Sequence, residues 1–454
     1  MSIDRRRLFA GLAGAGAVAA AAEAQSMPAR EAVPRTDIDA ALLGVRPNAA
    51  DDQSQALQRA IEHAAAARAV LRLPPGFYRA GGLQVPAYAA IAGVAGATRL
   101  VMSTGPSLLS ATGSDHLSIS GLVLDGAGIP LPERRGLLHV AQSRAFQISN
   151  CEVINSGRNG IALEAVEGDI TANTISGGDA AIFSIDARGL RIAGNTVRGT
   201  ANGGILVWRS SAGDDGTLIV DNRIEGVMNK AGGSGQWGNA INVFRADNVI
   251  VRGNRIRNAA FSAVRGNAAS NLQIVGNTCS AIGEVALYAE FGFEGALIAN
   301  NIVDGAALGI SVTNFDKGGR LGVVQGNLIR NLGGRRPAGT DPGDSAGIGI
   351  GIEADTAVIG NVVENVPYAG IAAGWGAYLR DVAITSNVVR GADFGITVSV
   401  APGAGAAVIS DNMISDVRRG AIVGMEWRKA VTGDLAKDGA AHYAQLSIGG
   451  NRVR

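Results

Sequence analysis

The sequence has few aromatic residues and few cysteines. Aromatic residues make up 4% of its 454 positions, and only two positions are Cys. Gly, by contrast, occurs 65 times, about twice its usual share. This combination is typical of tightly wound coils with narrow turns, in which Ala, Val, Ile and Leu fill a long, thin core.

The chain also has almost no net charge. Its formal charge is +1, and removing the leader described below leaves equal numbers of basic and acidic residues. No basic amphipathic helix is present in the sequence. We therefore expect neither a nucleic-acid partner nor a membrane-surface role.

Residues that commonly hold metals or phosphates lack the usual spacing. Glycine strings such as 347–351 have no following helix to hold a phosphate. The acidic pairs Asp214-Asp215 and Asp341/Asp344 favour solvated turns, with weak calcium binding as the alternative, and no other cofactor is expected. The four His do not have zinc-ligand spacing: His63, His116, His139 and His442.

One six-residue frame, Ile170-Thr171-Ala172-Asn173-Thr174-Ile175, recurs along the chain. Thirteen copies step by 22 to 39 residues, most often in the twenties. Cys151 and Leu122 occupy the Asn position in the two earliest copies. The other copies carry Asn at 173, 195, 222, 254, 277, 301, 327, 361, 387, 412 and 451.

A second strand-like motif, a small residue followed by aliphatic residues, alternates with this frame. Examples are Gly204-Ile205-Leu206-Val207 and Gly309-Ile310-Ser311-Val312. A period in the twenties indicates a solenoid. Two or three short strands per period, with no helix between them, predict an all-β, single-stranded parallel β-helix of about 13 coils.

The repeated Asn has a structural interpretation. Asn tolerates the left-handed or bridge conformations that occur at bends between strands. Because stacked coils lie about 4.8 Å apart, successive Asn amides can hydrogen-bond in a ladder: Asn173, Asn195, Asn222, Asn254, Asn277, Asn301, Asn327, Asn361, Asn387, Asn412 and Asn451. In the same frame Cys151 and Cys279 are five coils apart, about 24 Å. A disulfide requires Cα atoms within about 7 Å, so two free, inward-facing thiols are expected.

The first 24 residues are predicted to be an export leader. Arg6-Arg7-Leu8-Phe9 precedes a weakly apolar Ala/Gly run, and Ala22-Glu23-Ala24 is a small-x-small cleavage site. This segment resembles a twin-arginine signal, which implies the twin-arginine machinery as a partner and a periplasmic or secreted protein that is exported folded. No membrane anchor is expected after cleavage, since the run is short and weakly apolar.

Residues 25–50 are interpreted as a linker, and 51–110 as an N-terminal cap with the first strands. Residues 52–67 have the pattern of an amphipathic helix, for which Asp51 or Asp52 can be the N-cap. Leu73-Pro74-Pro75-Gly76-Phe77-Tyr78 follows this helix. The order resembles the entry to pectate-lyase-like right-handed β-helices, with 111–454 as the solenoid. With the leader, it resembles a family of twin-arginine-translocated repeat proteins without an established activity.

Long steps between copies predict loops at 208–217, 226–239, 333–347 and 425–445. Such loops often wall a groove on one flank of a solenoid. The last one is expected to help cover the C-terminal end.

Polar and aromatic residues concentrate on the outward positions of the middle coils. In each strand of the second motif, the residue after the aliphatic one is expected to point outward. The expected substrate-binding residues are Trp208, Trp237, Asn242, Arg245, Asn267 and Asn314. The expected catalytic residues are Arg265, Tyr288, Glu290, Asp316 and Lys317.

Two reaction types remain open for this cluster. Elimination from an acidic polysaccharide needs a cation, Arg265 or Lys317, and a base, Tyr288 or Lys317. Hydrolysis needs two carboxylates, for which Glu290 with Asp316 is the preferred pair and Glu353 the reserve. The sequence therefore predicts a polysaccharide- or envelope-glycan-binding protein that cleaves or epimerises its ligand. The alternative is a non-catalytic structural, carbohydrate-binding or surface-binding solenoid.

Overall fold

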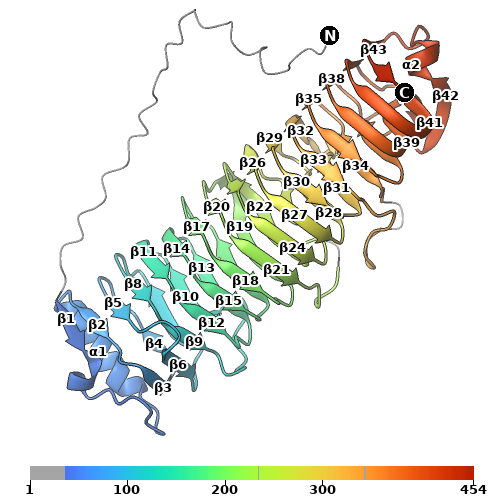
Figure 1. Cartoon of the computed structure of the whole chain (residues 1–454). Helices are drawn as coiled ribbons and strands as arrows, with labels where there is room; N and C mark the ends of the chain where they lie inside the picture. Colours follow the sequence, from blue (N-terminus) through green and yellow to red (C-terminus); the bar gives the residue numbers. More distant parts are fainter. Residues whose placement is uncertain (1–35, 234, 342–343) are drawn as a thin grey trace, which may run out of the picture. The chain divides into compact units, whose positions relative to one another are not determined.

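The protein is a right-handed parallel β-helix of about 14 turns. The structure is a computed structural model and describes residues 36–233, 235–341 and 344–454. The predicted leader, 1–24, and residues 25–35 lie outside the described residues. Figure 1 shows the strands of the described part stacked in parallel ladders along one axis.

Each turn contributes strands to three ladders, which we number as sheets 1 to 3. Sheet 1 is continuous and parallel over 16 strands. Its strands are β1 (Asp37–Asp39), β2 (Val70–Arg72), β5 (Ala90–Ala92), β8 (Ser118–Ser120), β11 (Arg144–Ser149), β14 (Glu167–Thr171), β17 (Arg191–Ala193), β20 (Leu218–Val220), β23 (Ile250–Arg252), β26 (Leu272–Val275), β29 (Glu294–Ala299), β32 (Arg320–Gln325), β35 (Thr356–Ile359), β38 (Val382–Thr385), β40 (Ala407–Ser410) and β43 (Leu446–Gly449).

Sheet 2 follows the Asn corner of each turn. It contains β3 (Gly76–Ala80), β6 (Thr98–Met102), β9 (Val123–Asp125), β12 (Glu152–Ile154), β15 (Thr174–Ser176), β18 (Thr196–Arg198), β21 (Arg223–Val227), β24 (Arg255–Ala259), β27 (Thr278–Ile282), β30 (Ile302–Asp304), β33 (Leu328–Arg330), β36 (Val362–Glu364), β39 (Val388–Ser399), β41 (Met413–Glu426) and β44 (Arg452–Val453).

Sheet 3 completes the turn. Its strands are β4 (Leu83–Gln84), β7 (Leu109–Thr112), β10 (Gly136–Ala141), β13 (Asn159–Glu164), β16 (Ala180–Ile185), β19 (Gly203–Asp214), β22 (Asn239–Asp247), β25 (Val264–Asn267), β28 (Val285–Glu290), β31 (Leu308–Val312), β34 (Ile348–Ile352) and β37 (Ala369–Ala373). The long strands β39 and β41 continue from sheet 2 into sheet 3, and β42 (Lys429–Asp434) pairs antiparallel with β41.

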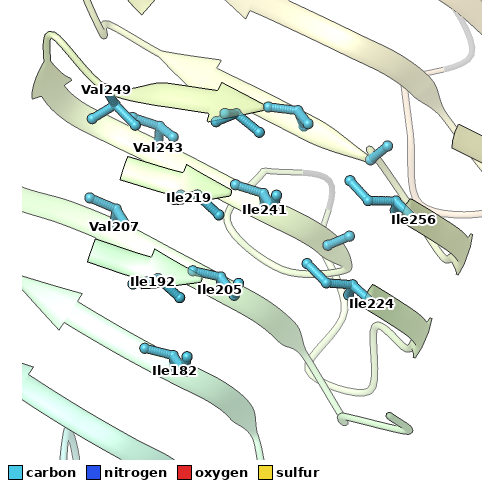
Figure 2. Packing of buried hydrophobic residues seen from close by; sticks show 14 of the residues in the cluster. Ile182, Ile192, Ile205, Val207, Ile219, Ile224, Ile241, Val243, Val249 and Ile256 are labelled. Atoms are coloured by element: carbon cyan, nitrogen blue, oxygen red, sulfur yellow. The ribbon is translucent and has the colours of Figure 1, made fainter. Parts of the chain in front are cut away.

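Aliphatic residues fill the space between the three sheets. In Figure 2, Ile192 and Ile219 of sheet 1 lie near Ile205 and Ile241 of sheet 3. Alternate residues of each strand point inward, which explains the β-branched alternation in the sequence. The two thiols are buried and free, as predicted. Burial raises the pKa of Cys151 to about 11 and that of Cys279 to about 12.

The repeated Asn residues form a hydrogen-bonded series between sheets 1 and 2. At Asn254, for example, Nδ2 donates to Asn277 Oδ1 at 3.0 Å and to the Ile219 carbonyl at 2.9 Å. The same pattern continues from Asn173 to Asn451. At the first of the eleven, Asn173 Oδ1 accepts the backbone N–H of Cys151 at 2.9 Å.

Of the two backbone conformations predicted for the Asn, the left-handed one was wrong. The left-handed residue is the one before each Asn position, with φ between 52° and 68°, and the ladder Asn residues do not have positive φ. Gly253 before Asn254 is one case, and Asp221 before Asn222 is another. The Asn is therefore required at this corner for its amide hydrogen bonds, because it has no left-handed backbone to accommodate.

The N-terminal end is capped by α1 (Ser54–Ala66). The helix begins two residues later than predicted, and its N-cap is Gln53, while Asp52 Oδ1 accepts the Ser54 N–H at 2.8 Å. Leu57, Ala60 and Ile61 are buried against the first coil. The predicted linker, 25–50, includes residues that belong to the fold. Within this range β1 pairs with β2, and the 3-10 helix η2 (Ala40–Leu43) packs on α1.

The predicted loops differ in structure. Residues 208–214 extend β19, whereas 228–238 and 331–347 connect strands of sheets 2 and 3. The last insertion forms β42 and the short helix α2 (Leu435–Asp438), and Leu435 is buried in the core at this end. No helix in the described ranges is long and apolar enough to span a membrane.

Candidate functional site

The outward row of sheet 3 has the predicted register. Parallel pairing places Asn242 next to Arg265, Arg265 next to Tyr288, and Tyr288 next to Ser311. A second outward row places Asn267 next to Glu290. The repeat therefore aligns these polar side chains on adjacent strands, about 4.8 Å apart.

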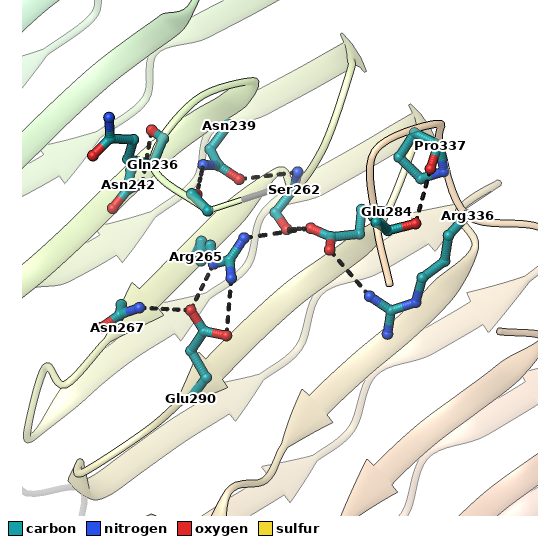
Figure 3. Close-up of polar contacts among 12 residues, drawn as sticks. Gln236, Asn239, Asn242, Ser262, Arg265, Asn267, Glu284, Glu290, Arg336 and Pro337 are labelled. Atoms are coloured by element: carbon teal, nitrogen blue, oxygen red, sulfur yellow. Dashed lines mark hydrogen bonds and ion pairs between the residues drawn. The ribbon is translucent and has the colours of Figure 1, made fainter. Parts of the chain in front are cut away.

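Loops cover this polar row, so its charged groups are buried rather than solvated. Arg265 is 7% exposed and Glu290 is 2% exposed. Figure 3 shows Arg265 with its guanidinium between two carboxylates. Its Nε and Nη2 contact both Glu290 oxygens at 2.7 and 3.0 Å, and its Nη1 lies 3.7 Å from Glu284 Oε2.

The second carboxylate, Glu284, links the row to a distant loop. It lies between β27 and β28 and is 3% exposed. Arg336 of the loop 331–347 contacts it at 3.0 Å, and Ser262 Oγ donates to it at 3.1 Å. Two arginines and two glutamates thus form one network, Arg265–Glu290–Glu284–Arg336, and Arg336 also lies 3.6 Å from the exposed carboxylate of Asp344.

The network and its burial shift the pKa of Glu284, Tyr288 and Arg265. Burial raises the pKa of Glu284, and burial followed by the charge of Glu290 raises the pKa of Tyr288 well above its usual value. Burial lowers the pKa of Arg265, but the Glu290 carboxylate outweighs this effect and holds it above normal. At neutral pH Tyr288 is therefore a phenol, and Arg265 is a cation that is already paired.

Tyr288 lines a pocket of about 320 Å³ that also contains Glu353. Glu353 follows β34, and its Oε2 accepts the Phe315 N–H at 2.7 Å. Burial, and then the nearby charge of Asp316, raise the pKa of Glu353 to about 7. A carboxyl that titrates near neutral pH can act as a proton donor or acceptor.

The structure separates the preferred catalytic residues into two groups. Arg265, Tyr288 and Glu290 are together, whereas Lys317 pairs with its neighbour Asp316 at 3.4 Å in the 3-10 helix η3 (Phe315–Lys317). Both Glu290 oxygens are engaged by Arg265. Glu353, the reserve carboxylate, is the acid whose pKa the Asp316 charge helps to raise.

Arg265 lines a second pocket, of about 220 Å³, and lies over the ring of Tyr288, which lines the first, at 5.2 Å. Trp208, Phe244, Asn242 and Asn267 line the second pocket, together with Gln236 of the loop 228–238. Trp208 packs on Trp237 with ring centroids 5.8 Å apart. Asn242 is 3% exposed, and its Oδ1 has no hydrogen-bond partner among the residues that the structure describes. The pocket combines an aromatic wall with an unused acceptor.

The remaining predicted binding residues lie at the edge of these pockets. Arg245 packs over Phe244 at 4.8 Å and donates to the Ser210 carbonyl. Asn314 lines the Glu353 pocket, and its Oδ1 accepts the Phe291 N–H at 3.3 Å. Asn267 donates to Glu290 at 2.8 Å.

A third pocket, of about 300 Å³, continues the hollow toward the C-terminal end. Trp375 lines both this pocket and the Glu353 pocket, and Trp427 closes the third one. The two rings are 5.5 Å apart in an edge-to-face arrangement. The three pockets follow sheet 3 from β19 to β41, roughly 38 Å at 4.8 Å per strand, and we call them the groove.

Sequence reasoning missed four residues of the groove: Glu284, Arg336, Trp375 and Trp427. Glu284 and Arg336 lie on connections of variable length, where the repeat frame gives no position. Trp375 and Trp427 could have been identified as candidates from the composition, because Trp is rare in this sequence. The sequence has four Trp, and the structure places all four at the groove.

The raised pKa of Glu353 predicts a pH-dependent stability. The unfolded chain releases this proton near pH 4.5 and the folded chain near pH 7, so stability is full below 4.5 and falls as pH rises to about 7. The shift corresponds to at most about 3 kcal/mol. Urea unfolding at pH 5 and at pH 8 measures the free energy of unfolding. This free energy should decrease less between the two pH values for Glu353→Gln than for the parent. Glu364→Gln, exposed on sheet 2, should behave like the parent.

Family models match two parts of the chain. A model described as "Right handed beta helix region" matches residues 203–389. One described as "Periplasmic copper-binding protein (NosD)" matches residues 96–244. A search of curated proteins gave no significant match.

The copper in that second description has no matching cluster of His, Cys, Asp or Glu side chains in the described part of the chain. Copper prefers clustered His, Cys or Met ligands. Within the described residues no group of three or more His, Cys, Asp or Glu could hold a metal ion, and both Cys are buried in the core. The residues therefore do not fit a copper site of this kind.

Solved structures share the fold at low sequence identity. The N-terminal fragment of bacteriophage Phi29 gene product 12 has a TM-score of 0.56 at 15% identity, over 85% of this chain and 68% of that one. A PL6 alginate lyase complex with trisaccharide has a TM-score of 0.55 at 15% identity, over 92% and 96%. The tailspike of E. coli bacteriophage HK620 has a TM-score of 0.51 at 12% identity, over 91% and 78%. These likenesses show that the chain is a right-handed parallel β-helix protein.

Proposed function

We propose that the protein binds a polysaccharide along the groove and acts on it by acid–base chemistry at Glu353. The observation that carries the proposal is the groove itself. Trp208 lies near one end, Trp375 and Trp427 lie toward the other, and a carboxyl with a pKa of about 7 lies between them. Aromatic faces and a few converging polar groups suit sugar rings better than a flat, solvated surface does.

Two of the structures with the same fold support a sugar ligand. Their titles name a trisaccharide on the alginate lyase and a hexasaccharide on the HK620 tailspike. Identity of fold alone does not assign an activity. The support therefore rests on this groove, and the titles indicate only that the fold can hold such chains.

The protonation states favour acid-assisted cleavage over elimination through Arg265 and Tyr288. Elimination needs a cation for the substrate carboxylate and a base for the proton on carbon. Arg265 is already neutralised by Glu290, and Tyr288 holds its proton at neutral pH. Glu353 can donate a proton to a glycosidic oxygen, and Asp316 is the nearby second carboxylate.

A non-catalytic role is the second candidate, and one observation favours it. The four members of the Arg265 network pair with one another, as expected of a structural element. In that case the groove would bind a glycan without turnover.

Export is part of the proposal. The twin-arginine-like leader and the family description "Periplasmic copper-binding protein" both suggest a periplasmic or secreted location. A fusion of residues 1–24 to a reporter that is active only after folded export would test the route. A reporter that stays active with Arg6→Lys/Arg7→Lys would overturn it.

A glycan panel on the purified protein tests binding and turnover together. Products are read as reducing ends and as the ultraviolet absorbance of unsaturated uronates, with and without calcium. Reducing ends without absorbance would support acid-assisted hydrolysis, and absorbance would support a lyase. Binding without products would favour the second candidate, and no binding across the panel would contradict both.

Trp375→Ala should weaken glycan binding at least about fivefold, because an aromatic contact contributes roughly 1 kcal/mol beyond its buried area. Trp375 borders two of the three pockets. Titration calorimetry with the best panel glycan measures the effect. Phe77→Ala, an exposed aromatic on β3 near the N-terminal cap, is the matched control. If the Trp375 variant and the parent bind the glycan with equal affinity, the groove is not the binding site.

A further inference from the structure

Sheet 2 carries a cluster of four arginines on a face distinct from the groove. A hollow of about 240 Å³ there is lined by four arginines, Arg198, Arg223, Arg255 and Arg257, and by one acidic residue, Glu225. The hollow therefore has a formal charge of +3. The whole chain, by comparison, has a formal charge of only +1.

Two of these arginines lie directly opposite each other. Parallel register pairs Arg223 with Arg255 on adjacent strands β21 and β24, and both are exposed. Like charges directly opposite on a sheet repel and destabilise the pair. No carboxylate contacts either of them in the described part of the chain.

The neighbouring outward row of the same sheet follows the opposite rule. Arg257 pairs with Glu225 at 2.5 Å, Arg330 with Asp304 at 2.8 Å, and Arg390 with Asp416 at 2.8 Å. On this face an exposed arginine normally has an acidic neighbour. The Arg223–Arg255 pair breaks that pattern at the hollow.

Hydroxyl donors border the arginines. Thr196 precedes Arg223 in its row, Thr278 follows Arg255, and Ser280 follows Arg257. All three line the hollow. Guanidinium forks together with hydroxyls are the usual partners of carboxylate, sulfate and phosphate oxygens.

We propose that this hollow, the arginine site, binds an oxyanion group: a carboxylate, sulfate or phosphate, either free or carried by an acidic glycan. A bound oxyanion accepts hydrogen bonds from Arg223 and Arg255 at once and removes their repulsion. Nucleic acid fits less well, because it needs a longer basic stripe and aromatic residues for stacking. The lining has no aromatic residue, and the arginines span only three strands. The site does not depend on the proposed function of the groove.

The test compares two double variants that lose the same charge. Arg223→Gln/Arg255→Gln removes the two opposed arginines of the site. Arg330→Gln/Arg390→Gln removes two paired arginines from the same sheet. The probes are heparin, polygalacturonate, inorganic phosphate and neutral dextran. Heparin or polygalacturonate should bind the parent and the control with equal affinity. Its affinity for the site variant should be at least tenfold lower. The slope of log affinity against log salt concentration should also become shallower, by the equivalent of up to about two ionic contacts.

The probes distinguish the sources of the oxyanion. Binding of phosphate alone, lost in the site variant, would indicate a small free ligand, and binding of the polymers alone would indicate a glycan. Phe77→Ala, which lies on β3 away from both sites, should leave both results unchanged. Equal binding by the site variant and the parent, or an equal loss in the control, would overturn the proposal. Thermal unfolding of both variants verifies folding, and relief of repulsion should keep the site variant at least as stable as the control.

Discussion

Asn254→Ala is expected to lower the free energy of unfolding by about 3–5 kcal/mol. The Asn254 side chain accepts from the backbone N–H and the Nδ2 of Asn222, at 2.9 and 3.0 Å, and donates to the Ile219 carbonyl. Asn254 is fully buried, so water cannot replace these bonds. Each buried group left without a partner costs about 1–3 kcal/mol.

The same substitution at the end of the ladder is the control. Asn451 is half-buried, and its side chain contacts Asn412 and the Ile409 carbonyl. Asn451→Ala should cost about 1 kcal/mol or less, because solvent reaches the freed groups. Denaturant unfolding of both variants measures the difference. An equal, small effect at both positions would show that the ladder is a by-product of coil stacking rather than a main source of stability.

The ladder and the outward rows were predictable for the same reason. In a parallel solenoid the register follows from the repeat, so aligning the copies places Arg265 beside Tyr288 and Asn267 beside Glu290 without any structure. The chemistry of the site was less predictable. The repeat does not predict that Arg336, which is 52 residues after Glu284 in the sequence, contacts the Glu284 carboxylate.

Burial decided the roles of the candidate residues, and burial depends on the loops. As outward residues of a sheet, Arg265 and Glu290 were expected to face solvent and substrate. The loops cover them, and they become a paired structural network. Their removal would leave an unpaired buried charge, so their substitution would report on stability before it reported on binding. The proposed acid–base role of Glu353 depends on burial in the same way, because burial raises its pKa.

Glu353→Gln is expected to reduce turnover of a glycan by about 10²–10⁴-fold while leaving its binding nearly unchanged. This range is typical for loss of a general acid or base. Gln keeps the size of the side chain and an oxygen to accept the Phe315 N–H, so it removes only the titratable proton. Initial rates on a glycan that the panel shows to be cleaved, with affinity measured in parallel, test the prediction. Glu364→Gln again serves as the control.

The pH dependence of the parent then identifies which proton transfer Glu353 performs. A general acid must be protonated, so turnover would fall as pH rises through about 7. A general base would give the opposite slope in the same range. The Gln variant should lose that titration in either case. A variant that keeps parental turnover with an unchanged pH profile would exclude Glu353 from the chemistry and leave its raised pKa as a consequence of burial alone.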